Sequence, residues 1–373
     1  MAVKVTWEQA LAFRMRRHLL DPVGTLTVDR VVRRLCGVQA QVASSAELAV
    51  RLRRASSKPR EVGRALANGR LVKTWAMRGA LHLLTPQEGG VFLSLMAAGR
   101  SWERPSWQRY FGVTSKDMDV LRRTVREALD GAVLSREELI AVVTRRRGMK
   151  HLGEALGSGW GTLLKPLAWQ GDLCFGPTRG NRVTFTRPEA ASSRWAGVPS
   201  PEEAAPLAIA AFVGAHGPTT PDRFGDWVAS GWFGKRTLRT WFEALGDRLG
   251  EVEVGGEATF VLSEDLDELV STKPTKAVRL LGGFDQYVLG PGTADPHVVP
   301  ARRRAAVSKQ AGWISPVVVA GGPVSGTWEL DGDEVRVAWF KEAGRPPRKA
   351  LEAEIERLSS ILDRNLRAAV IVS

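Results

Sequence analysis

The feature of this sequence that most constrains its fold is an order of segments that occurs three times. Each time, stretches with the apolar spacing of amphipathic helices precede two short alternating stretches that flank a turn signal. Helices followed by a two-stranded hairpin are typical of the winged-helix variant of the helix-turn-helix. We therefore predict three tandem winged-helix units. They span residues 1–100, 101–190 and 200–263, with hairpin tips at Arg78-Gly79, Gly180-Asn181 and Gly255-Gly256.

The remainder of the chain, residues 270–373, has a different pattern. Short apolar stretches separated by Gly and Pro predict strands, and residues 349–364 have the spacing of an amphipathic helix before a last strand. We expect a small β-rich, barrel-like domain with a terminal helix. The predicted fold class is therefore α+β, with three winged-helix units followed by a C-terminal β-rich region.

Charge is unevenly distributed along the 373 residues. The net charge is +13 overall, with 33 Lys and Arg against 16 Asp and Glu in residues 1–200, and 20 against 24 in residues 201–373. A strongly basic half favours a polyanionic partner, most commonly nucleic acid, although a solvated basic surface is the alternative. Two isolated cysteines, no signal-peptide pattern and no long apolar stretch predict a cytoplasmic protein without a membrane partner.

Several classes of chemistry have no support in the sequence. The five histidines and two cysteines lack metal-ligand spacing, and neither a Walker A motif nor a GxSxG elbow is present. One partial glycine motif, GSGWGT, does not follow a predicted strand and lacks the third glycine. We therefore expect no metal and no cofactor.

Two glutamines, Gln39 and Gln41, lie between two predicted helices in the stretch GVQAQ. Gly37 indicates that the preceding helix has ended, and Ser44 with Glu47 has the pattern of a capping box for the next helix. On an extended backbone, side chains two residues apart point to the same side. Two amides there could hold one water or donate to a phosphate or base edge. The alternative is that they satisfy backbone groups at the helix ends.

Three stretches, GVQAQ, WAMRGALHLL and FDQYVLG, occur in the order seen in the AlkZ/YcaQ superfamily of winged-helix DNA glycosylases, which the chain resembles over nearly its whole length. The Q-x-Q form is similar to the AlkZ branch. The resemblance implies that Gln39 and Gln41 are catalytic. It also implies a lesion-contacting hairpin, which we place near residues 288–304.

The resemblance further implies a monofunctional enzyme that hydrolyses the N-glycosidic bond of bulky N7-alkylpurines in double-stranded DNA. It also implies that the winged-helix units and the C-terminal region form a concave DNA-binding surface. Unhooking of interstrand crosslinks and self-resistance to a DNA-alkylating natural product belong to the same expectation. We expect a monomer that acts in the cytoplasm at the nucleoid. A non-catalytic winged-helix regulator fits the charge and fold equally well, and a drug-sequestering protein fits less well.

Other polar residues are candidate DNA contacts, each with a structural alternative. Arg78 and His82 lie in the first hairpin, where turn and core roles are equally compatible with the sequence. Asp285 and Tyr287 alternate with apolar neighbours, which fits a DNA channel or structural hydrogen bonding. His297 could enter a groove, and the alternative is that it is only exposed. The remaining candidates are Arg302, Arg303 and Arg304; three adjacent arginines cannot all be buried at low cost, which favours phosphate binding.

Overall fold

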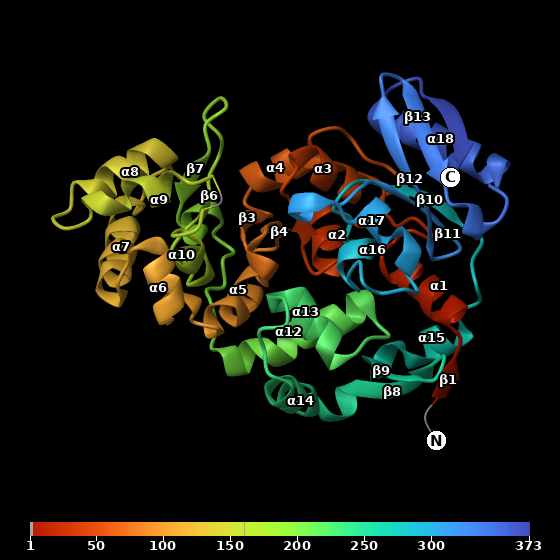
Figure 1. The fold of residues 1–373 in the computed structure, drawn as a ribbon, viewed down its shortest axis with the longest axis horizontal. Coiled ribbons are helices and arrows are strands. Elements are labelled where there is room, and N and C mark those ends of the chain that lie inside the picture. Colours follow the sequence, from red (N-terminus) through yellow and green to blue (C-terminus); the bar gives the residue numbers. More distant parts are fainter. Residues whose placement is uncertain (1–2, 160) are drawn as a thin grey trace. The chain divides into compact units, whose positions relative to one another are not determined.

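The chain folds into two compact units that are interleaved along the sequence (Figure 1). The computed structural model describes residues 3–159 and 161–373. Unit 1 comprises Met1–Val62, Ile209–Trp227 and Lys235–Ser373, and unit 2 comprises Gly63–Ala208 and Val228–Gly234. The first predicted winged-helix segment contributes residues to both units.

The N-terminal part of unit 1 contains three short helices and the glutamine pair. They are α1 (Trp7–Arg17), α2 (Val28–Arg34) and α3 (Ala43–Arg51), with the two-residue strand β2 (Val38–Gln39) between α2 and α3. The predicted capping box of α3 is wrong, because α3 begins at Ala43 and has no side-chain cap. The Glu47 carboxylate instead accepts hydrogen bonds from the backbone N–H groups of Glu61 and Val62, at the start of α4 (Glu61–Ala67).

A second part of unit 1 contains the third predicted hairpin. The strands β8 (Leu249–Val254) and β9 (Glu257–Leu262) pair in antiparallel register around Gly255-Gly256, as predicted. The N-terminal strand β1 (Val3–Val5) joins β8 in parallel, which the local pattern does not indicate. The helices α14 (Lys235–Glu243) and α15 (Leu266–Ser271) belong to this region, together with α12 (Pro201–His216) from Ile209 onward and α13 (Pro221–Ala229) up to Trp227.

The C-terminal sheet of unit 1 is open. Its order is β10-β11-β12-β13-β14, antiparallel except for the parallel pair β13 and β14, so the expected barrel is not formed. The strands are β10 (Val278–Leu281), β11 (Val317–Ala320), β12 (Val324–Asp331), β13 (Glu334–Trp339) and β14 (Arg367–Val372). The terminal helix α18 (Arg348–Leu362) packs its apolar face into the same core as the sheet.

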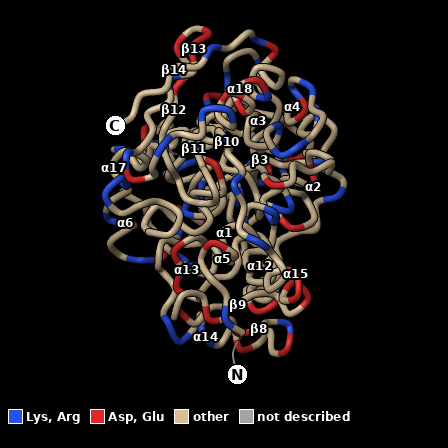
Figure 2. Tube along the Cα trace, turned by 90° about the vertical axis from the view of Figure 1, so that its right-hand side faces the viewer, with Lys and Arg blue, Asp and Glu red and all other residues tan. Residues whose placement is uncertain are grey.

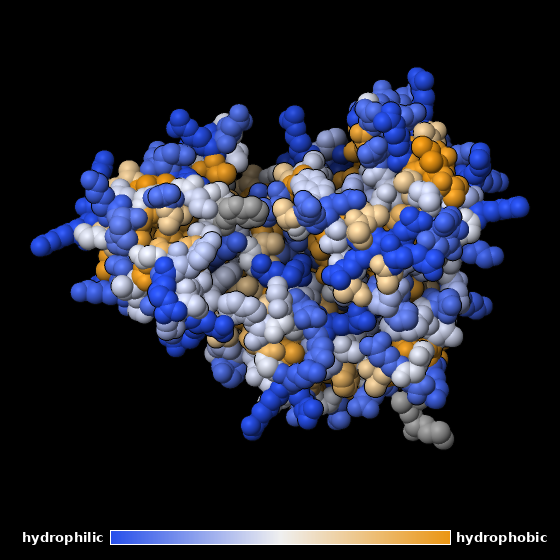
Figure 3. All heavy atoms as spheres, in the orientation of Figure 1, coloured by the Kyte–Doolittle hydropathy of each residue, from blue (hydrophilic) through white to orange (hydrophobic). Residues whose placement is uncertain are grey.

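The edge strand β14 carries exposed apolar side chains. Ile371 and Val372 lie at the C-terminal end, where the space-filling view shows an apolar patch (Figure 3). Between β10 and β11 the chain forms two short helices, α16 (Gln286–Leu289) and α17 (Arg304–Val307), in place of the expected strands. Asp285 caps α16 by accepting from the backbone N–H of Tyr287 at 2.8 Å, which favours helix over strand there.

Unit 2 contains the other two predicted hairpins. The strand β3 pairs with β4 around Arg78-Gly79, and β6 pairs with β7 near Gly180-Asn181, both antiparallel as predicted. Within this unit the strand order is β4-β3-β6-β7-β5. The strands are β3 (Val72–Trp75), β4 (Leu81–Leu84), β5 (Leu134–Ser135), β6 (Cys174–Phe175) and β7 (Thr184–Thr186). The helices are α5 (Gly89–Ala98), α6 (Pro105–Phe111), α7 (Ser115–Ala128), α8 (Arg136–Thr144), α9 (Gly153–Gly157), α10 (Lys165–Trp169) and α11 (Pro188–Ala191).

Charged residues occur on most elements of both units. In the view of Figure 2, Lys and Arg lie along the α2–α4 region, and Asp and Glu gather around α15. No helix in the described part of the chain combines the length and apolar character that a membrane crossing requires.

Candidate active site

The glutamine loop, residues 37–41, has the predicted extended backbone over Val38–Gln39. The helix α2 ends at Arg34, and Gly37 then adopts a φ of +95°, a conformation that favours glycine. Gln39 is 8% exposed, whereas Gln41 is exposed to solvent just before α3. The loop therefore presents one amide in a shielded position and one at the surface.

Neither glutamine side chain is used to complete the fold. Among the described residues, no protein group hydrogen-bonds to the Gln39 or Gln41 amide. The end of α2 is closed by its own backbone, and no side chain caps the start of α3. The alternative role, satisfaction of helix-end backbone groups, is thus not seen. A shielded amide with free donor and acceptor capacity suits the binding of a water or a substrate, because such groups are otherwise costly to bury.

A tight turn at residues 281–285 lies directly against α3. A Cβ atom built on Gly282 would meet the Leu48 side chain at 3.2 Å, and one built on Gly283 would come within 3.8 Å of Ser45 Oγ. Ser45 lies in the first turn of α3, immediately after the glutamine loop. The turn therefore packs against α3, the helix that follows the glutamine loop.

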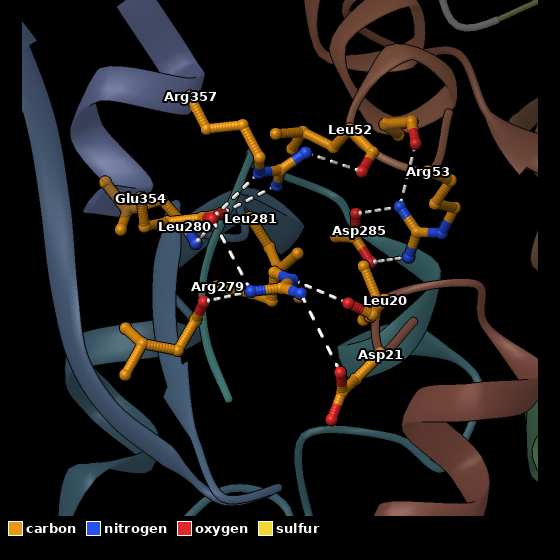
Figure 4. Close-up of polar contacts among 12 residues, drawn as sticks. Leu20, Asp21, Leu52, Arg53, Arg279, Leu280, Leu281, Asp285, Glu354 and Arg357 are labelled. Atoms are coloured by element: carbon orange, nitrogen blue, oxygen red, sulfur yellow. Dashed lines mark hydrogen bonds and ion pairs between the residues drawn. The ribbon is translucent and has the colours of Figure 1, made fainter. Parts of the chain in front are cut away.

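Buried ion pairs fix this turn in place (Figure 4). The Arg53 guanidinium donates to both Asp285 carboxylate oxygens at 2.8 and 2.6 Å, and both side chains are fully buried. On the strand side, Glu354 accepts from the backbone N–H of Leu280 at 3.1 Å and from Arg357. This network joins the N-terminal helices to the C-terminal sheet within unit 1.

The hairpin expected near residues 288–304 is not there. That segment is the end of α16, a turn-rich loop, a 3-10 turn at Ala301–Arg303 and the start of α17. A short hairpin follows a few residues later, where Ser308 and Ile314 form an antiparallel bridge and Lys309 N–H donates to the Trp313 carbonyl at 2.8 Å. We refer to it as the 308–314 hairpin.

The 308–314 hairpin has an exposed tip that could reach a ligand. Trp313 is 51% exposed, and its ring packs edge-on against Phe284 with centroids 5.0 Å apart. Lys309 and Gln310 at the tip are also exposed. Gly312 is the only turn signal that the sequence offers for this hairpin. The turn also has Ala311 at a φ of +54°, a conformation that an alanine in a sequence does not predict. Sequence reasoning therefore missed this hairpin.

The loop that was expected to be the hairpin is anchored at its centre. Asp295 is buried and lies 3.0 Å from an Arg223 nitrogen and 3.9 Å from an Arg14 nitrogen. His297 is half-buried and stacks on Trp7, with ring centroids 3.7 Å apart and planes 10° from parallel. Through these contacts Asp295 and His297 hold the loop against α1 and α13.

Asp285 and Tyr287 lie in the core rather than in a channel. Each is at most 1% exposed. Asp285 pairs with Arg53, and the Tyr287 hydroxyl donates to the Gly322 carbonyl at 2.7 Å. Burial raises the pKa of Tyr287 well above its usual value, so the phenol stays protonated. Of the two readings offered for these residues, the structure favours structural hydrogen bonding over DNA contact.

The three adjacent arginines have different environments. Arg303 donates to Glu342 at 2.9 Å and to the Ser373 carbonyl at 2.7 Å, and its guanidinium lies over the Phe340 ring. Arg302 is largely exposed, 3.6 Å from Glu342, and Arg304 is exposed. Arg303 therefore holds the C-terminal segment, while Arg302 and Arg304 remain available to phosphate.

Arg78 and His82 belong to unit 2, whereas the glutamine loop belongs to unit 1. Arg78 lies at the hairpin tip with a φ of +55°, and burial lowers its pKa to about 10, which leaves it charged at neutral pH. His82 is fully buried on β4, and its Nδ1 lies 3.0 Å from the Ala80 carbonyl. The structure places His82 in the core, the alternative that the sequence left open.

Burial and the nearby Arg78 charge lower the pKa of His82 to about 3. In the unfolded chain the same group titrates near 6.5, so between pH 6.5 and pH 3 only the unfolded state binds this proton. Stability should therefore be complete above pH 6.5 and fall as the pH decreases below it, by up to about 1.4 kcal/mol per pH unit. Urea unfolding of the wild type at pH 7, 6, 5 and 4 measures the slope.

A His82→Leu variant is the control for this pH dependence. His18 is also buried with a lowered pKa, so part of the acid sensitivity will remain. The slope between pH 6 and pH 4 should nevertheless be shallower in His82→Leu, by about one proton. An identical slope in the two proteins would show that His82 is protonated in the folded state.

Comparison with known proteins identifies the enzyme class to which this geometry belongs. The model of the family described as "DNA glycosylase AlkZ-like" matches residues 32–361, which is most of the chain and includes the glutamine loop. The chain belongs to the AlkZ-like DNA glycosylase family. The resemblance inferred from GVQAQ and the later motifs is thereby confirmed, and the protein is a DNA glycosylase rather than a non-catalytic regulator.

Two relatives support the same assignment. An interstrand DNA cross-link repair glycosylase of Streptomyces sahachiroi is 49% identical over 353 residues, which are 94% of this chain and 95% of that protein. The solved structure of the Streptomyces sahachiroi DNA glycosylase AlkZ matches with a TM-score of 0.96 at 47% identity and covers 99% of this chain and 100% of its own. Across residues 3–159 and 161–373, no group of three or more His, Cys, Asp or Glu side chains is arranged to hold a metal ion.

Proposed function

We propose that this DNA glycosylase hydrolyses the N-glycosidic bond of bulky N7-alkylpurines in duplex DNA and unhooks interstrand crosslinks. The observation that carries the proposal is the glutamine loop, with a shielded amide at Gln39, an exposed one at Gln41, and neither bonded to the described protein. The name of the 49% identical relative, an interstrand DNA cross-link repair glycosylase, supports the crosslink substrate. Self-resistance to a DNA-alkylating natural product is the corresponding biological role.

Neutral amides suffice for this reaction because the leaving group is already activated. A purine alkylated at N7 carries a positive charge and leaves without a general acid. The sugar then develops oxocarbenium character, as in glycoside hydrolysis. What remains is to place a water on the far face of C1′ and to direct carbonyl dipoles toward the developing cation. Two glutamine carbonyls can do both, and they are too weak to act on an undamaged, neutral purine.

The proposed DNA contacts in unit 1 follow from exposure and charge, and the one in unit 2 follows from charge and position. In unit 1 they are the 308–314 hairpin, through Lys309 and Trp313, together with Arg302 and Arg304. In unit 2 the proposed contact is Arg78, which is charged and lies at a hairpin tip. The three helix–hairpin segments are proposed to be DNA-binding winged helices. The enzyme is proposed to act as a monomer on nucleoid DNA in the cytoplasm, and without a lyase step because no lysine adjoins the glutamines.

Base release from a defined duplex tests the function. The purified protein should release N7-methylguanine from a duplex with one such lesion, producing abasic sites that break only after alkali treatment. With an interstrand-crosslinked duplex, denaturing gels should show conversion to single strands. Strand breaks without alkali would indicate a lyase. Duplex binding without release from either substrate would contradict the proposed substrate class, and the no-protein reaction sets the spontaneous rate.

A further inference from the structure

We propose that Gly283 is a positioning residue for the reaction, because it sets the separation between the glutamine loop and the 308–314 hairpin. The inference rests on the proposed function, in which the glutamine loop holds the water and the hairpin contacts the lesion. Both groups must then meet one nucleotide, so their separation determines whether the water is aligned with C1′. All the elements involved belong to unit 1.

Gly283 is the place where the two sides touch. A Cβ atom built on it would lie 2.8 Å from the Ile314 carbonyl oxygen, at the end of the hairpin, and 3.8 Å from Ser45 Oγ, in the first turn of α3. Gln41 lies two residues before α3 begins. The single hydrogen of Gly283 thus separates the backbone of the hairpin from the helix that follows the glutamine loop.

The turn itself cannot easily shift to relieve a clash. At one end, Trp328 Nε1 donates to the Leu281 carbonyl at 2.9 Å. At the other end, Asp285 is held by both nitrogens of Arg53. Phe284 between them is 4% exposed, has a φ of +62° and supports the Trp313 ring. A group added at Gly283 should therefore displace the hairpin or α3 rather than the turn.

Space, not backbone conformation, requires glycine at this position. Neither Gly282 nor Gly283 has a positive φ, so alanine is compatible with both backbones. At Gly283 the obstacle is a backbone oxygen at a distance that real Cβ atoms do not adopt. At Gly282 the nearest atom is the end of the flexible Leu48 side chain at 3.2 Å, which can move. The two adjacent glycines therefore form a matched pair.

The experiment compares Gly283→Ala with Gly282→Ala. Single-turnover release of N7-methylguanine is measured with each protein in excess, alongside the Kd for the same duplex and the Tm. We expect the Gly283→Ala rate to decrease at least tenfold, with a Kd within threefold of wild type and a folded protein by Tm. Gly282→Ala should retain the wild-type rate within threefold. A general loss of folding would reduce DNA binding and the rate together. A lower rate with an unchanged Kd therefore indicates a positioning role for Gly283.

The outcomes separate this inference from the proposed function. A wild-type rate in Gly283→Ala, or equal losses in both glycine variants, would overturn the positioning role. If the wild-type protein releases no N7-methylguanine, the proposed function fails, whatever Gly283→Ala does. If the glutamine variants remain fully active, the glutamine loop is not catalytic and the positioning role of Gly283 fails with it. Should Gly283→Ala not fold, Phe284→Leu lowers the support under Trp313 without adding a group to the turn. It should reduce the rate with unchanged Kd, and an unchanged rate there would overturn the proposal.

Discussion

Replacing both Gln39 and Gln41 with alanine should abolish base release while leaving DNA binding intact. Both side chains lack hydrogen bonds to the described protein, so their removal should leave the fold unaltered. Loss of preorganised dipoles at a developing charge typically decreases the rate about 10²–10³-fold. Single-turnover release of N7-methylguanine, measured with Kd and Tm for the same protein, checks the expectation. A double variant with the wild-type rate would exclude the pair from catalysis.

Gln41→Asp is the matched variant for this experiment. Gln41 is exposed, so a carboxylate there carries little desolvation penalty. An anion should orient the water and stabilise the oxocarbenium-like state at least as well as an amide. We expect Gln41→Asp to retain release of N7-methylguanine and to accept less activated bases. A folded but inactive Gln41→Asp protein would contradict the water-positioning mechanism.

Local signals explain which parts of the fold could be predicted. Each of the three hairpins has a short turn of two or three residues that contains glycine, and the pairing of β3–β4, β6–β7 and β8–β9 follows those turns. The extended backbone at Gln39 likewise follows from the helix stop at Gly37, a neighbour in sequence. These features depend on contacts between residues close in sequence. Hydrophobic periodicity and turn-forming residues are therefore enough to predict them.

Features set by distant residues were not predictable in the same way. The strand β1 pairs with β8 across almost 250 residues, and no local pattern specifies such a partner. Glu47 has the spacing for a capping box, but its carboxylate instead accepts hydrogen bonds from the backbone N–H groups of Glu61 and Val62. The alternating stretch around Asp285 is compatible with an exposed carboxylate. Its burial depends on Arg53, which lies 232 residues earlier in the chain.

The same long-range packing displaced part of the predicted site. The hairpin that the resemblance implied near residues 288–304 is wrong, because those residues fold as a loop and short helices in which Asp295 pairs with Arg223 and lies near Arg14. The 308–314 hairpin has only one bridge and a left-handed alanine, so its sequence has no run of alternation to detect. Sequence motifs therefore predicted the local backbone of the glutamine loop better than the position of a hairpin.

Breaking the ion pair between Arg53 and Asp285 should have the largest effect on stability. Both side chains are fully buried and joined by two hydrogen bonds, so Arg53→Met leaves an unpaired carboxylate in the core of unit 1. Removal of one partner from a buried pair typically destabilises a protein by about 3–5 kcal/mol. Denaturant unfolding should show this loss, and it should exceed any change in Kd for DNA measured under conditions where the variant is folded.

The double variant Arg53→Met with Asp285→Asn distinguishes a structural pair from a DNA contact. The asparagine oxygen can still accept from the Tyr287 N–H and cap α16, while no charge remains buried. Replacement of both charges should therefore recover much of the stability lost in Arg53→Met, with a coupling free energy well above 1 kcal/mol. If Asp285 instead faced DNA, Asp285→Asn alone would change the Kd and leave the unfolding midpoint at its wild-type value.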